Sequence, residues 1–97
     1  IDGNGLLTMN WEQFYKYIDL SFDGFYSKLT QKYPTLNEKE IQLCCMLRSG
    51  FKTDEIAAIW MNSVFSVHKY KTNIRKKVDA PEGADIIVFL SEKLSLQ

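Results

Sequence analysis

The side chains best suited to chemistry in this sequence form a cluster of cations. Five basic residues and the single histidine fall within ten positions: His68, Lys69, Lys71, Arg75, Lys76 and Lys77. No Asp or Glu occurs anywhere between Ile56 and Val78, although the whole chain carries 12 acidic and 12 basic residues. A local excess of positive charge on a chain of zero net charge suits a polyanion such as nucleic acid. A Lys-rich helix that faces solvent is the alternative reading of the same charges.

Other reactive residue types lack the partners that catalysis or metal binding would need. His68 has no metal ligand or nucleophile at a useful spacing. Cys44 and Cys45 are neighbours, and neighbouring side chains on a helix point about 100° apart, so we expect two small core residues and no zinc site or disulfide. Glu38 and Glu40 face different ways on a helix, and we expect Glu40 to cap its helix or to pair with a base on the cationic helix. We therefore expect no enzyme, no metal and no cofactor.

The elements that position the cations are helices, because apolar residues recur at helical spacing and no strand pattern is present. Trp11, Phe14, Tyr15 and Ile18 form one such face. The predicted helix caps and breaks are, in chain order, Asn10, Ser21, Pro34, Asn37, Gly50, Thr53 and Ser63, followed by the loop 79–83 and a last helix at 84–94. The sequence therefore predicts an all-α fold of five or six helices.

The cations fall on the second of two consecutive predicted helices, a pattern typical of a helix-turn-helix at about 53–78. We expect a buried stripe on this second helix, made of Val67, Tyr70, Ile74 and Val78. The stripe leaves a polar outer face that is suited to phosphate and base contacts: Ser66, Lys69, Thr72, Asn73 and Lys76.

In this region the chain resembles the LuxR/GerE-type helix-turn-helix domain. The residues that carry the resemblance follow one another in register without gaps: Leu36–Glu40, Gly50, Glu55–Ala57, Ser63, Ser66–Val67, Asn73–Ile74 and Lys77–Val78. The resemblance implies a four-helix DNA-binding domain, here 36–97, preceded by an N-terminal helical extension at 1–35. It also implies the output domain of a larger bacterial sensor or response-regulator protein that works in the cytoplasm.

The same resemblance implies which residues meet DNA. His68, Lys69 and Thr72 would enter the major groove. Backbone-phosphate positions are implied at Ser63, Ser66, Asn73 and Lys76, and the charge of Arg75 adds to this nucleic-acid surface. The last helix is a dimer surface in many members of the family, which implies a homodimer interface at Ile86, Ile87, Leu90 and Leu94. That helix could equally pack on the N-terminal helices.

Two other functions stay open beside a DNA-binding transcription regulator. A sigma-factor-type region would share the helix-turn-helix and act as a monomer through RNA polymerase, which is thus a further candidate partner. A protein-interaction module could keep the fold without binding DNA. No stretch approaches the roughly 20 apolar residues that span a bilayer, so we expect no membrane contact. For the aromatic residues of the N-terminal segment, we favour packing over a dimer surface or a connection to a sensory domain.

Overall fold

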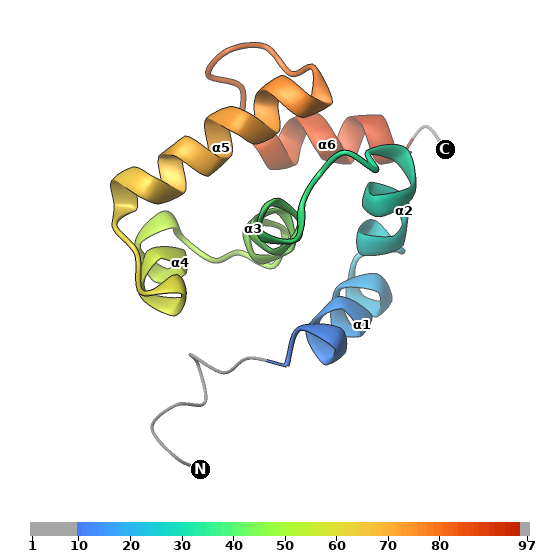
Figure 1. Ribbon diagram of the computed structural model, residues 1–97. Coiled ribbons are helices and arrows are strands. Elements are labelled where there is room, and N and C mark those ends of the chain that lie inside the picture. Colours follow the sequence, from blue (N-terminus) through green and yellow to red (C-terminus); the bar gives the residue numbers. More distant parts are fainter. Residues whose placement is uncertain (1–9, 96–97) are drawn as a thin grey trace.

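The computed structural model describes residues 10–95, which form six α-helices and no strand. The helices are α1 (Trp11–Ser21), α2 (Phe25–Lys32), α3 (Glu38–Arg48), α4 (Thr53–Trp60), α5 (Val64–Val78) and α6 (Ile86–Ser95) (Figure 1). The predicted all-α class is confirmed. None of these helices is long and apolar enough to cross a bilayer.

Hydrogen bonds from side chains explain where α3 and α5 begin. Asn37 Oδ1 accepts from the Glu40 backbone N–H at 2.9 Å, and Glu40 Oε1 accepts from the Asn37 N–H at 2.8 Å, which completes the predicted capping box. Ser63 Oγ accepts from the Ser66 backbone N–H at 3.0 Å and caps α5 as predicted. Gly50 follows α3 with φ +99°, a left-handed conformation in which glycine has no steric cost.

The boundary between α1 and α2 differs from the prediction. Ser21 was expected to cap α2, but it is the last residue of α1, and Gly24 with φ +76° precedes α2. The capping acceptor comes instead from within α1. The Asp19 carboxylate accepts from the Ser27 backbone N–H at 2.9 Å and from the Ser27 hydroxyl at 2.6 Å. A cap eight residues away along the chain leaves no local signal of the kind that sequence reading uses.

One hydrophobic core joins all six helices. Each helix contributes at least one side chain that is fully buried: Ile18, Leu29, Leu43, Ile56, Ile74 and Leu90, from α1 to α6 in order. α1 and α2 both pack against α3, and α2 also packs against α6. The hydrophobic core therefore continues across the expected division between 1–35 and 36–97. That division marks where the family resemblance begins.

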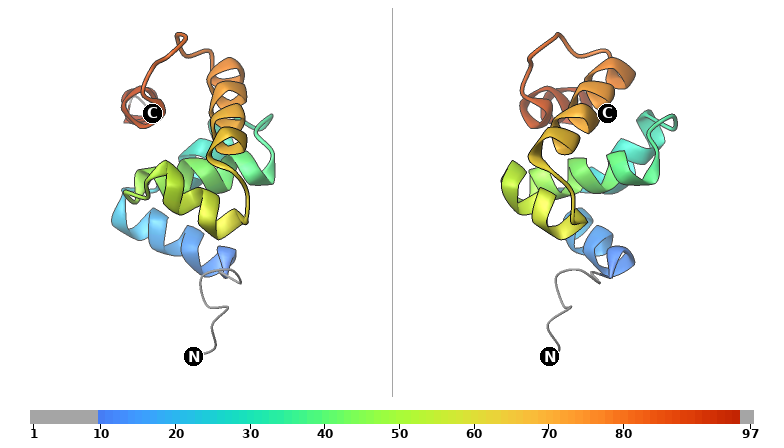
Figure 2. Two further views of the ribbon diagram at one scale, coloured as in Figure 1. Left: turned by 90° about the vertical axis from the view of Figure 1, so that its left-hand side faces the viewer. Right: turned by 60° about the vertical axis from the view of Figure 1, so that its left-hand side comes forward.

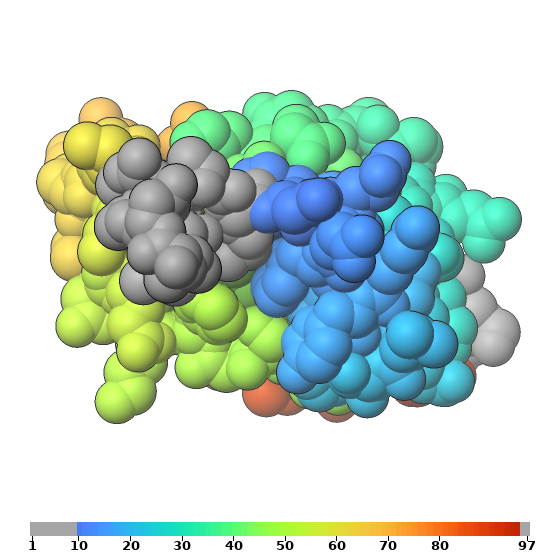
Figure 3. All heavy atoms as spheres, turned by 90° about the horizontal axis from the view of Figure 1, so that it is seen from below, coloured from blue at the N-terminus to red at the C-terminus, as the bar shows by residue number. Residues whose placement is uncertain are grey.

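The long helix α5 lies across the outside of this bundle. It crosses over α3, with α4 beneath its first half and α6 beside its second half (Figures 1 and 2). From the opposite side, α1 and α4 cover much of the surface, and α5 is visible only at the margin (Figure 3). α5 is therefore supported from behind while its outer side stays open.

The last helix corrects the expected dimer interface. Ile86, Leu90 and Leu94 are buried within the chain itself, at 4%, 0% and 3% exposure, and Ile87 is half-buried. Ile86, Leu90 and Leu94 pack between α2, α3 and α5 and are not free to meet a second copy. The expectation that these three residues form a dimer surface is wrong, because α2, α3 and α5 cover them within the chain. The exposed apolar side chain of α6 is Val88.

Candidate nucleic-acid interface

A tight turn joins α4 to α5. Met61 ends α4 with φ +55°, a left-handed conformation, and the Asn62 N–H donates to the Ala57 carbonyl at 2.9 Å. Ser63 then begins α5 at once. The two helices pack directly on one another, and the rings of Trp60 and Tyr70 meet edge to face at 5.2 Å between centroids. This contact fixes the direction of α5 relative to α4.

The inner side of α5 carries the predicted apolar stripe. Val67, Ile74 and Val78 are buried, and Tyr70 is half-buried against α4. Six of the expected site residues on the helix or at its cap are exposed on the other side: Ser63, His68, Lys69, Thr72, Asn73 and Lys76. Ser66 is half-buried. The structure therefore brings these polar groups together on one open helix face.

Two of the basic residues hold α5 in place and do not share its outer face. Lys71 Nζ donates to the Thr53 hydroxyl at 2.7 Å, which ties α5 to the first residue of α4. Arg75 Nε donates to the Ala84 carbonyl at 2.7 Å, which ties α5 to the residues before α6. Both side chains are half-buried. Arg75 was expected at the nucleic-acid surface, and the structure places it on the flank of α5 that faces α6.

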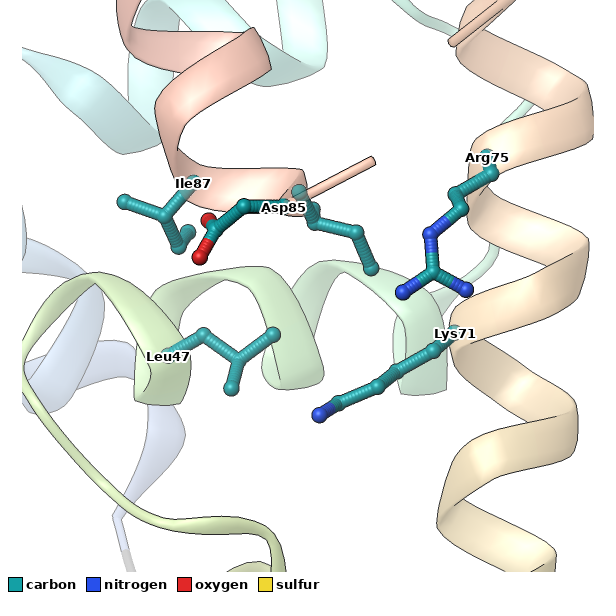
Figure 4. Close-up of a pocket in the computed structure, with 6 residues that line it drawn as sticks. Leu47, Lys71, Arg75, Asp85 and Ile87 are labelled. Atoms are coloured by element: carbon teal, nitrogen blue, oxygen red, sulfur yellow. The ribbon is translucent and has the colours of Figure 1, made fainter. Parts of the chain in front are cut away.

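Lys71 and Arg75 converge on a pocket of about 230 Å³ between α3, α5 and α6 (Figure 4). Leu47 and Ile87 supply its apolar wall, and Asp85 supplies a carboxylate at its edge. Burial lowers the pKa of Lys71, and the nearby Arg75 charge lowers it further, while Asp85 opposes the shift. The pocket therefore concentrates two cations on the flank of α5.

Lys77 is the third basic residue with an internal role. Its Nζ atom lies 2.8 Å from Glu40 Oε1 and 3.2 Å from the Thr35 carbonyl oxygen. Glu40 both completes the cap of α3 and pairs with a base on α5, so both roles predicted for it are confirmed.

The cations that remain on the outer face are Lys69 and Lys76. Neither takes part in an ion pair or donates a hydrogen bond within residues 10–95. Lys69 Nζ lies 4.9 Å from the centre of the Phe65 ring. The five clustered cations thus divide into three that position α5 and two that stay available to a ligand.

Sequence reading missed an apolar feature beside these lysines. Met61, Val64 and Phe65 are exposed where α4 passes into α5. The signal was present, because the spacing that buries Val67 and Ile74 also places Phe65 on the opposite side of the helix, in line with Lys69.

Comparison of the chain with protein-family models, with curated proteins and with solved structures gave no match.

Proposed function

We propose that the chain is a sequence-specific DNA-binding domain of a transcription regulator, in which α4 and α5 form a helix-turn-helix and α5 lies in the major groove. The observation that carries the proposal is the outer face of α5. It is a 15-residue helix braced from behind by α3, α4 and α6, with exposed lysine, threonine, asparagine and histidine side chains and no acid between Ile56 and Val78. The major groove, about 12 Å wide, admits one α-helix of this kind.

The positions along α5 suggest separate roles for its polar groups. His68 and Lys69 lie in the first half of the helix, the part that a helix-turn-helix presents to base edges, and Thr72 lies just past its middle. Lys76 lies one to two turns later, where its charge would neutralise a phosphate and release a counterion. The half-buried Ser66 shares the Ser63 cap, since the two hydroxyls are hydrogen-bonded at 3.1 Å.

The LuxR/GerE resemblance supports the same assignment. The motif positions at Asn37, Glu40, Gly50 and Ser63 are those that cap or end helices here, so the resemblance coincides with local structure as well as with residue type. On this basis we propose the output domain of a bacterial regulator that acts in the cytoplasm. A homodimer on DNA would have to use the exposed side of α6 near Val88, or another face, and not the buried stripe.

Selection of bound sequences from a random duplex library at moderate salt tests the proposal. Enrichment of an inverted repeat, with half-sites about one helical turn apart, supports a dimeric regulator. Enrichment of a single motif supports specific binding by a monomer, as a sigma-type region would show. The absence of any enriched sequence contradicts the proposed function and favours a protein-interaction module.

A further inference from the structure

Two exposed apolar side chains, Val64 and Phe65, lie at the beginning of α5, near the exposed lysines Lys69 and Lys76. Phe65 is 68% exposed and Val64 is 42% exposed. Phe65 precedes Lys69 by four residues and Thr72 by seven, so the three lie on one helix face. Burial of a phenylalanine side chain is favourable, and in the isolated chain Phe65 does not obtain this stabilisation.

We propose that Phe65, with Val64 beside it, contacts the 5-methyl group of a thymine in the major groove and thereby determines part of the sequence preference. The inference rests on the proposed function, because it requires α5 to lie in the groove. Among the base edges that the major groove presents, the thymine methyl is the apolar group, and phenylalanine is one of the side chains that contacts it. The first turn of a recognition helix is the part that meets base edges.

Charge argues for a duplex as the occupant of this surface rather than a second copy of the chain. Lys69 lies against the Phe65 ring, and Lys76 follows on the same face. A symmetric contact between two such faces would bring these lysines close to their own copies, which is unfavourable. A duplex offers phosphates to the lysines and a methyl group to the ring at the same time.

The test uses the duplex obtained by selection, with each thymidine replaced in turn by deoxyuridine, which lacks the methyl group. For the unaltered protein, one or two replacements should weaken binding about fourfold, because burying one methyl group is worth close to that factor. Phe65→Ala should weaken binding to the thymidine duplex and should bind both duplexes alike. Phe65→Leu should restore part of the difference. Leu20→Ala, which removes an exposed apolar side chain from α1, should keep the full difference.

The outcomes separate this inference from the proposed function. Equal binding to every deoxyuridine duplex, or a methyl dependence that persists in Phe65→Ala, overturns the role of Phe65 while specific DNA binding stands. A change of oligomeric state in Phe65→Ala shows that the surface meets protein, which also overturns it. Failure to select any preferred duplex overturns the proposed function, and the inference falls with it. Since Phe65 is exposed, thermal unfolding should confirm that the variants fold.

Discussion

Lys77 Nζ lies 2.8 Å from Oε1 of Glu40, whose side chain is 2% exposed. The same carboxylate oxygen accepts the backbone N–H of Asn37 at 2.8 Å. The contact therefore joins the last turn of α5 to the first turn of α3, and it gives the buried charge of Glu40 a cation and a cap donor together. Its neighbour Lys76 points outward without such a partner among residues 10–95, so two adjacent lysines have opposite roles.

Replacement of Lys77 should destabilise the fold. Lys77→Met leaves the Glu40 carboxylate buried without its cation, and we expect a loss of about 1–3 kcal/mol in the free energy of unfolding. The loss stays below that of a fully buried pair, because the Lys77 side chain is 35% exposed. Urea unfolding measures it. Lys76→Met is the matched control and should change stability by less than about 0.5 kcal/mol. Equal stabilities of the two variants would show that the pair contributes nothing.

The two free lysines should differ in their effect on DNA binding. Lys69→Ala should weaken binding to the selected duplex more than to random duplex, because the proposed placement of α5 in the major groove puts Lys69 against base edges. Lys76→Ala should weaken both alike and lower the salt slope of the binding constant by about one. Fluorescence anisotropy over a series of salt concentrations measures both effects. Sequence preference that survives Lys69→Ala intact would rule out this placement of α5 in the groove.

The buried stripe of α6 should matter for stability and not for association. Leu90→Ala should cost about 2–5 kcal/mol, the range for a leucine removed from a packed core. Val88→Ala, on the exposed side of the same helix, should cost less than about 0.5 kcal/mol. Thermal and urea unfolding provide the comparison. If Leu90→Ala dissociated a dimer and left the monomer equally stable, the packing of α6 on the core would be refuted.

Alkaline pH should destabilise the protein through its two thiols. Burial raises the pKa of Cys44 from 9.0 to about 12, and burial also raises the pKa of Cys45. Because the folded-state pKa is raised, the stabilisation is complete below about pH 9. It is lost as the pH rises toward 12, since the unfolded chain releases protons that the native state keeps. We expect the free energy of unfolding to fall by about 1–3 kcal/mol between about pH 8 and pH 10.

The double variant Cys44→Ala with Cys45→Ala serves as the control for the thiols. Its stability should decline less steeply over the same pH range, even if its absolute stability is lower because of the lost volume. The native thiols should also react with Ellman's reagent only after unfolding, since both side chains are fully buried. Rapid labelling under native conditions would contradict their burial.

Local features of the fold were predictable from the sequence. Asn10, Asn37 and Ser63 begin helices as predicted. The side chain of each of these N-cap residues accepts a hydrogen bond from a backbone N–H only three residues later, so the signal is local. The buried stripe of α5 follows from helical periodicity, and so does the burial of Cys44 and Cys45 in α3. These signals depend on neighbours in the sequence, and tertiary packing did not override them.

Features that depend on distant contacts were not predictable in this way. The cap that Asp19 supplies to Ser27 spans two helices. The covered stripe around Leu90 depends on where α2 lies, which no spacing within α6 reveals. The sequence showed where the cations cluster, but Lys71 and Lys77 became structural through partners 18 and 37 residues away. Consecutive residues on a helix point about 100° apart. The packing of the neighbouring helices therefore decides which of these closely spaced cations contact the protein and which face solvent.

A titration of the isotope-labelled protein with the selected duplex, followed through backbone amide NMR signals, tests most directly whether α5 binds DNA. We expect the signals that shift first and most to belong to the outer face of α5, around Lys69, Thr72 and Lys76. Signals of α1 should stay in place, because α1 lies on the opposite side of the molecule (Figure 3). Shifts confined to α1 or to the exposed side of α6, or no shifts with a duplex in excess, would contradict the claim that α5 is the DNA-binding helix.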